Sequence, residues 1–205
     1  MGRSKGNIDS SDMTTARNLL LASALKLFNE KGYASTTVRE IVADAGVTKP
    51  VLYYYFGNKE GIYLKILEGP LQKFEELLEN FGCEGGRASE KLKALCESSF
   101  QFYCENIEKA KLMNAIYYGP PQGAPYLNFE AYHGKLSNTV EQLVEEGIRT
   151  HEFCEMDLKD ITLAIIGAFH IAMDIMLCQT PRITVSQDVL SRILNVIFHG
   201  ILKKE

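Results

Sequence analysis

The sequence predicts an all-α protein of about nine helices, in which a small N-terminal domain of three helices precedes a larger helical domain. Apolar residues recur at intervals of three and four through the long segments of the 205-residue chain. No segment alternates apolar and polar residues as a half-buried strand does. Stretches rich in glycine and proline separate the periodic segments, which indicates helices joined by turns.

The composition is that of a globular protein, with 46% hydrophobic and 23% charged residues. No stretch reaches the ~20 apolar residues of a membrane span, because the most apolar one, residues 161–173, contains Thr162 and His170. The N-terminus lacks the hydrophobic core of a signal peptide. A cytoplasmic protein without a membrane partner is therefore expected.

The net charge of −4 conceals an asymmetry along the chain. Residues 1–66 hold nine Lys and Arg against six Asp and Glu, a balance of +3, and the remainder holds 13 against 20, a balance of −7. This asymmetry fits one domain that faces DNA and a second domain that is acidic.

The first segments predict an arm followed by a helix. Residues 1–11 are polar and lack an apolar period, so a flexible arm is expected. Arg3 and Lys5 could touch a DNA minor groove from this arm, and the alternative is a solvated tail. From about Thr14 to Lys31 the apolar residues keep helical spacing, and Gly32 is predicted to end this helix.

Two short helices are predicted next, separated by a sharp turn. Thr37 can cap the first, with Glu40 completing a capping box, and Gly46 suits the left-handed backbone of the turn. Thr48 can cap the second helix, which has Pro50 in its first turn. Such a pair predicts a helix-turn-helix.

One side of the second short helix is basic and aromatic. Lys49, Tyr53 and Tyr54 fall on this side, opposite the apolar Leu52, and a surface of this kind suits a DNA major groove. Lys59 follows at the start of a third helix, whose free amides favour an anion such as a phosphate. The alternatives are that the tyrosines are half-buried packing residues and that Lys59 is a solvated lysine.

Three segments carry a resemblance to a known family. The segments are Thr37–Ile41, Ala45–Val47 and Leu52–Glu60, and their order and spacing resemble the signature of the TetR family of transcriptional regulators. The resemblance covers roughly residues 14–66, and beyond them only the helical architecture agrees. It implies a homodimeric repressor that binds a pseudo-palindromic operator and leaves it when a small, largely apolar or aromatic effector binds.

The resemblance also implies roles for parts of this chain. Residues 12–68 would be the DNA-binding domain and residues 69–205 the effector-binding and dimerisation domain. Lys49, Tyr53 and Tyr54 would meet the major groove, and Arg39 could contact either bases or phosphates. The remaining matched positions would hold phosphates, and they are Thr37, Thr48, Tyr55 and Lys59.

The rest of the chain predicts further helices without a motif. Gly69-Pro70 interrupts the helix over residues 59–80, where a kink or break and a domain boundary are expected. Helices are predicted near residues 92–103, 110–117, 132–150, 157–178 and 186–202, with non-helical segments at 82–86, 119–125 and 179–184.

The last two predicted helices carry more apolar surface than one core contact needs, which indicates a subunit interface. His170 and Asp174 share one face of the first of them, either as a satisfied pair or as part of an effector pocket. Apolar and aromatic side chains with a few polar groups would line that pocket, although each could equally be ordinary core. The candidates are Phe102, Tyr103, Met113, Tyr117, Phe129, His133, Phe169, His170 and Met173.

Cofactor, metal and catalytic sites are not predicted. The chain lacks phosphate-binding glycine loops, nucleophile elbows and H-E-x-x-H. The cysteines are odd in number and form no C-x-x-C pair, so free thiols are expected and a redox sensor is the alternative. They are Cys83, Cys96, Cys104, Cys154 and Cys178. The rival functions are an all-α enzyme and a ligand-independent architectural or partner-binding protein.

Overall fold

The structure, a computed structural model, describes residues 10–81, 85–178 and 186–201. Within these ranges it contains nine α-helices and no strand, which confirms the all-α prediction. The helices are α1 Ser10–Ser35, α2 Val38–Asp44, α3 Lys49–Phe56, α4 Lys59–Asn80, α5 Ala88–Glu105, α6 Ile107–Tyr117, α7 Phe129–Arg149, α8 Leu158–Cys178 and α9 Gln187–Ile201.

Two of the predicted segments fall at the limits of this description. Residues 1–9 of the expected arm, with Arg3 and Lys5, lie outside the described residues, whereas Ser10 and Ser11 already belong to α1. The non-helical segment predicted at residues 179–184 also lies outside them.

The chain divides into two compact units, each of which is made of two separate segments of the sequence. The first unit comprises Met1–Pro70 and Glu108–Leu127, and the second comprises Leu71–Ile107 and Asn128–Glu205. Most of α6 and the loop after it therefore group with the N-terminal helices. The functional domain limits 12–68 and 69–205 stay a prediction.

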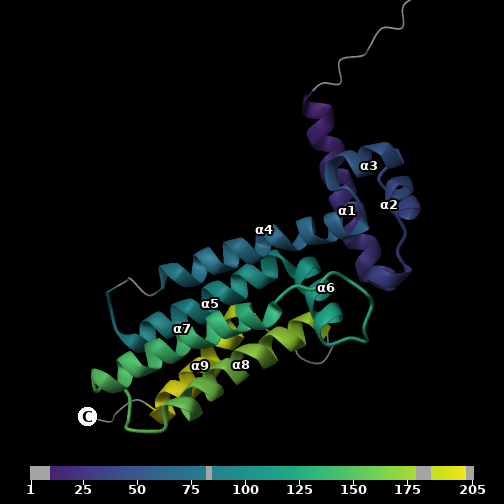
Figure 1. The fold of residues 1–205 in the computed structure, drawn as a ribbon. Helices are drawn as coiled ribbons and strands as arrows, with labels where there is room; N and C mark the ends of the chain where they lie inside the picture. The colour runs from purple at the N-terminus through teal and green to yellow at the C-terminus, as the bar shows by residue number, and fades with distance from the viewer. Residues whose placement is uncertain (1–9, 82–84, 179–185, 202–205) are drawn as a thin grey trace, which may run out of the picture. The chain divides into compact units, whose positions relative to one another are not determined.

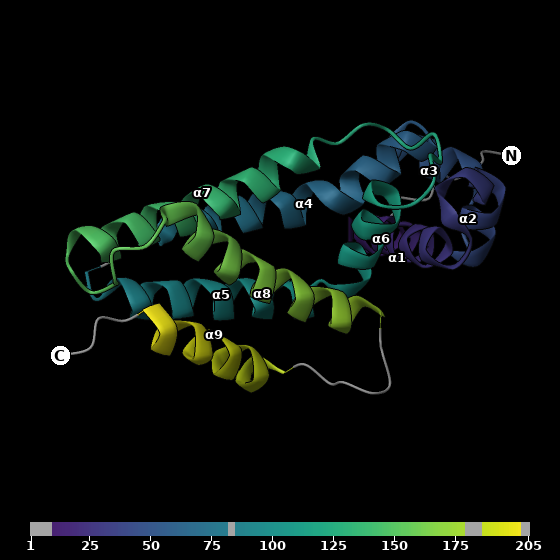
Figure 2. The same ribbon diagram turned by 90° about the horizontal axis from the view of Figure 1, so that it is seen from below.

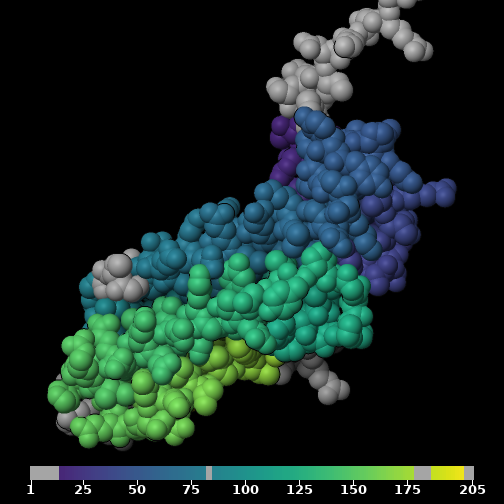
Figure 3. Space-filling model, viewed as in Figure 1, coloured from purple at the N-terminus to yellow at the C-terminus, as the bar shows by residue number. Residues whose placement is uncertain are grey.

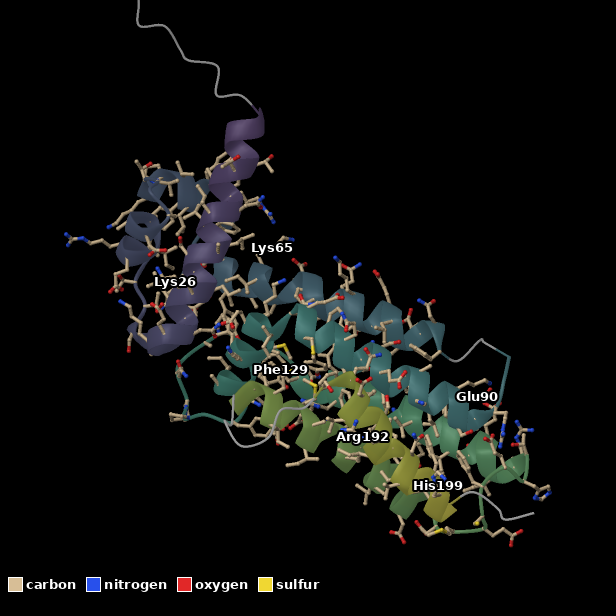
Figure 4. The ribbon with its side chains drawn as sticks, turned by 180° about the vertical axis from the view of Figure 1, so that it is seen from behind. Lys26, Lys65, Glu90, Phe129, Arg192 and His199 are labelled. Carbon is tan, nitrogen blue, oxygen red and sulfur yellow. The ribbon has the colours of Figure 1, made fainter. Side chains whose placement is uncertain are left out.

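In the first unit, α1 packs on both α2 and α3, and α2 packs on α3 (Figure 1). Lys26 of α1 also pairs with Asp44 of α2 at 2.7 Å (Figure 4). Val47 and Phe56, although apolar, are only partly buried. The buried apolar residues of the helices in this unit include Leu20, Ala24, Leu27, Phe28, Ile41, Val42, Leu52, Ile62 and Ile66.

The helix α1 contains a break at Gly32, where φ is 81° and ψ is 161°. Only glycine adopts this backbone region readily. The prediction that the first helix ends at Gly32 is confirmed by this break, and the structure adds one further helical turn after it. The turn after Gly32 is held by the buried ring of Tyr33. The centroid of this ring lies 5.3 Å from that of Phe28 and 5.2 Å from that of Tyr63.

The helix α4 continues through Pro70, so of the kink or break expected at Gly69-Pro70 the break is wrong. Proline removes one backbone hydrogen bond, but apolar side chains on both sides of it are buried. Ile66 and Leu67 precede it and Leu71 and Phe74 follow it, each at most 5% exposed. Burial of these neighbours offsets the local cost of the proline.

The second unit is a helical bundle in which α5 contacts α7, α8 and α9 (Figure 2). The carboxylate of Glu152 accepts hydrogen bonds from the amides of Ala88 at 2.7 Å and Ser89 at 3.3 Å, which satisfies the start of α5. The bundle core includes Leu92, Leu95, Phe100, Leu136, Val140, Ile161, Ile165, Phe169, Leu190, Leu194 and Phe198.

The helix α8 is apolar nearly all round, as predicted. Among the described residues, its segment Leu158–Leu177 is the one helix long and apolar enough to cross a membrane by length and composition, with a mean hydropathy of 1.7. This departs from the expectation that no stretch would qualify. A core helix passes the same test, and Ile161, Ile165 and Phe169 of α8 are buried in the bundle core.

Candidate nucleic-acid interface

The first short helix begins with the predicted capping box. The hydroxyl of Thr37 accepts from the Glu40 amide at 3.3 Å, and Glu40 Oε2 accepts from the Thr37 amide at 2.9 Å. The Thr37 hydroxyl also donates to Glu40 Oε2 at 2.8 Å. Its single proton is thus committed to Glu40, so it must turn away from the carboxylate before it can donate to a phosphate.

The carboxylate of Glu40 has a second partner. Lys31 Nζ donates to its Oε1 at 2.6 Å. This hydrogen bond, followed by those from Thr37, lowers the pKa of Glu40 to about 2. The end of α1 and the start of α2 are therefore linked by an ionised carboxylate.

The turn and the start of α3 follow the sequence pattern with one exception. Gly46 adopts a left-handed φ of 66°, and the amide of Val47 donates to Val42 O at 3.0 Å. Thr48 has the extended backbone of a cap residue, but its side chain makes no cap hydrogen bond, so that detail of the prediction is wrong. The exposed Thr48 hydroxyl is therefore not committed to its own helix.

The two sides of α3 differ as the sequence predicts. Leu52 is fully buried, whereas Tyr53 is 50% exposed and Tyr54 72% exposed. Lys49 is exposed as well, and Figure 3 shows the α3 segment at the surface of the first unit. Tyr55 is half-buried, with its ring centroid 5.0 Å from that of Tyr54. The expectation of an exposed basic and aromatic side is confirmed.

Arg39 is exposed on α2, the first short helix. Together with Lys49 it gives the helix pair two cations at the surface. Guanidinium and ammonium groups both donate to phosphates and to guanine edges. The exposed hydroxyls of Thr48, Tyr53 and Tyr54 add groups that donate and accept.

Lys59 occupies an environment that neither alternative foresaw. Its Nζ donates to the backbone oxygens of Tyr33 at 2.9 Å and Thr36 at 3.0 Å, and lies 4.2 Å from the centroid of the Tyr33 ring. Burial lowers the pKa of Lys59. Two of its three donors are occupied, and one is left for a phosphate. The adjacent Asn58 caps α4, its Oδ1 accepting from the Gly61 amide at 2.7 Å.

Comparison with known proteins identifies this arrangement. Residues 20–66 match the model for bacterial regulatory proteins of the tetR family. The N-terminal helices therefore carry the domain of tetR-family regulators. Over 197 residues the chain is 25% identical to the HTH-type transcriptional regulator YdgC of Bacillus subtilis, covering 92% of this chain and 94% of that protein. The match and this similarity support a DNA-binding helix-turn-helix transcriptional regulator.

Two further similarities concern proteins named KstR2. The HTH-type transcriptional repressor KstR2 of Rhodococcus jostii is 33% identical over 93 residues, 45% of this chain and 46% of that protein. The structure of the ketosteroid transcriptional regulator KstR2 of Mycobacterium tuberculosis has a TM-score of 0.71 at 21% identity, covering 98% of this chain and all of that one. The second similarity shows that the two chains share a fold.

Several of the predicted effector-site residues come together in the second unit. Tyr103 lies 6.4 Å from Phe102 and 6.1 Å from Phe169 between ring centroids, and Phe74, which the sequence did not single out, lies 5.6 Å from Tyr103. We call these four residues the aromatic cluster. Met173 and Phe129 are buried.

Two histidines lie beside the aromatic cluster. His133 of α7 and His170 of α8 meet edge to face with 5.5 Å between their ring centroids, and His170 lies 6.1 Å from Phe169. Burial lowers the pKa of both histidines, with the neighbouring His170 adding to the effect on His133 and Asp174 opposing the effect on His170. Asp174 itself is exposed in the single chain.

Met113 and Tyr117, the other two predicted effector-site residues, lie in another part of the chain, and their contact with an effector stays a prediction. Both lie in α6 within the part of the chain that groups with the first unit. Tyr117 packs on Tyr118, with 4.7 Å between ring centroids. Their selection followed the helical period of α6, which does not reveal the unit in which a helix packs.

The described cysteines are not in disulfides. Cys96, Cys104 and Cys154 are free, and burial raises the pKa of Cys96 to about 12, which makes that thiol unreactive. Cys83 and the side chain of Cys178 lie outside the described part of the chain. In that described part, no group of three or more His, Cys, Asp or Glu side chains could hold a metal ion.

Proposed function

We propose that this chain is a homodimeric repressor of the TetR family that works in the cytoplasm and releases a pseudo-palindromic operator when a small effector binds. The exposed side of α3 is the observation that carries this proposal. Lys49, Tyr53 and Tyr54 reach base edges in the major groove, and Arg39 contacts a base or a phosphate. The phosphate contacts come from Thr37, Thr48, Tyr55 and the remaining donor of Lys59.

The second copy of the chain packs on α8 and α9. Leu163 and Ile171 of α8 are 68% and 53% exposed, and Val196 of α9 is 74% exposed. Arg192 and His199, also exposed, lie along α9 (Figure 4). A dimer that covers these apolar side chains presents two α3 helices, which must meet half-sites about 34 to 36 Å apart or a multiple of that spacing.

The effector is largely apolar or aromatic and binds in the second unit at the aromatic cluster and the two histidines. Rings supply the apolar contacts, and His133 and His170 supply polar groups that fix orientation. KstR2 of Mycobacterium tuberculosis is a ketosteroid regulator, and a ketosteroid is a largely apolar molecule of this kind. The effector favours a dimer geometry that misfits the operator, within the limit set by its differential affinity for the two states.

Selection of bound duplexes from a random DNA pool tests the proposal directly. The expected product is a two-fold symmetric motif that the chain binds with strong salt dependence. Thermal shifts with apolar small molecules then test the effector site. A pool without enrichment, in a chain that is folded and dimeric, would contradict the proposed function.

A further inference from the structure

The corner between α1 and α2 is held by side chains from distant segments. The hydroxyl of Thr36, only 1% exposed, shares its single proton between Gly32 O at 2.8 Å and Leu27 O at 3.1 Å. Lys59 Nζ donates hydrogen bonds to the backbone oxygens of Tyr33 and Thr36. Thr37 comes next and begins α2, so this corner sets the direction in which the helix pair leaves α1.

One contact at this corner comes from outside the first four helices. The amide of Tyr33, just beyond the break at Gly32, donates to Gln122 Oε1 at 2.7 Å. Gln122 lies in the loop between α6 and α7, 89 positions further along the chain. A β-carbon at Gly32 would come within 2.6 Å of the same oxygen, so glycine provides both the backbone conformation and the space.

A second contact ties the same segment to α1. Asn29 Nδ2 donates to the backbone oxygen of Glu108 at 2.8 Å and to its Oε2 at 3.1 Å. Glu108 lies in the first turn of α6. Residues 108–127 are therefore fastened near both ends to the last turns of α1, which is why they group with the first unit (Figures 1 and 2).

We infer that Gln122 is a positioning residue for DNA binding, because its amide oxygen fixes the corner from which α2 and α3 are presented. The inference rests on the proposed function. It adds a positioning contact that belongs to neither the operator surface nor the effector site.

The test uses the full chain and two variants of one side chain. Gln122→Leu keeps the approximate size and removes the acceptor, whereas Gln122→Glu keeps an oxygen that accepts from the Tyr33 amide. Gln101→Leu is the matched control, because Gln101 is exposed on α5 and bonds only locally to Glu105 at 2.9 Å. Each protein is titrated with the selected operator and with random duplex over a range of salt.

For Gln122→Leu, the ratio of operator to random affinity should fall about 5- to 10-fold, the range that one hydrogen bond supplies. The slope of affinity against salt should not change, because no charge is lost. Gln122→Glu should restore the ratio, and Gln101→Leu should leave it unchanged. The amide of Tyr33 should also exchange its hydrogen faster in Gln122→Leu, and not in the other two variants.

Two results would overturn the inference. One is an unchanged ratio in Gln122→Leu with a lower melting temperature, which would reduce Gln122 to a stabilising contact. The other is an equal loss on operator and random DNA. If the unmodified chain itself selects no operator, the proposed function fails, so the two failures are distinguishable.

Discussion

The exposed side of α3 and the exposed side of α8 and α9 leave different kinds of atoms in water. Lys49, Tyr53 and Tyr54 offer an ammonium group and two hydroxyls, which water solvates well. Leu163, Ile171 and Val196 offer only hydrocarbon, which costs about 25 cal/mol for each Å² left exposed. The chemistry of the exposed atoms, more than their exposure, therefore distinguishes the surface proposed for DNA from the surface proposed for a second copy.

The largest expected effect comes from placing charge on the apolar surface. Leu163→Glu combined with Ile171→Glu should dissociate the dimer, because burying two carboxylates there is unfavourable. Losing the linkage of two DNA-binding units should weaken operator binding about 10² to 10⁴-fold. Sedimentation gives the oligomeric state, and mobility shifts give the affinity.

The control for this experiment is Met156→Glu. Met156 is 49% exposed in the same unit but precedes α8. It should leave both the dimer and operator binding intact. A double variant that stays dimeric would remove α8 from the interface.

The next effect concerns the polar surface. Lys49→Ala should cost about 1 to 3 kcal/mol at one base pair of the operator and relax preference only there, if the ammonium reaches a guanine edge. Competition among operators altered at single positions measures this. The control is Lys65→Ala, since Lys65 on α4 pairs with Glu68 at 2.6 Å. Equal losses on operator and random DNA would instead assign Lys49 to a phosphate.

Replacing Lys59 should affect both the stability of the fold and the affinity for DNA, and the two effects can be measured separately. Lys59→Met should lower the free energy of unfolding by about 2 kcal/mol, since two carbonyl oxygens lose a charged donor. If its third donor holds a phosphate, the slope of log affinity against log salt should also fall by about 0.9. Denaturant unfolding and salt titrations measure the two effects. An unchanged slope would restrict Lys59 to its role at the α1 corner.

The smallest effect is a pH dependence from the second unit. The pKa of His133 and of His170 is lowered in the folded chain, so the unfolded chain binds more protons just below pH 6.5. The stability that the neutral pair contributes is fully present above pH 6.5 and is lost as the pH falls through the folded pKa values. Denaturant unfolding between pH 7.5 and 5.5 measures this loss of stability, and the range is chosen to span the ordinary pKa of histidine, about 6.5.

The matched variant for the pH experiment replaces both histidines. His133→Phe combined with His170→Phe should flatten the dependence over that range. A dependence that persists in this variant would assign it to other groups.

Local chemistry predicted much of the first unit. The capping box at Thr37, the left-handed Gly46 and the exposed side of α3 depend on neighbours within one or two turns, which a sequence displays directly. The nine helices likewise follow from apolar spacing. Contact between these side chains and DNA stays a prediction.

Contacts between distant segments were not predictable in the same way. Partners many residues away determine the extra turn after Gly32 and the position of Lys59. The same is true of the hydrogen bond between Gln122 and the amide of Tyr33. Pro70 remains within a helix because buried neighbours on both sides hold it there. The grouping of Met113 with the first unit was not predictable for a related reason, since apolar spacing shows that a side is buried but not what covers it.

The carboxylate of Glu40 at the start of α2 stays ionised down to a low pH. Its pKa of about 2, against an ordinary value of 4.5, means that the link between Lys31 and Thr37 loses its charge only as the pH falls through that low value. The start of α2 therefore keeps this link at any pH well above that value, and the response to protons expected below pH 6.5 comes from His133 and His170 in the other unit.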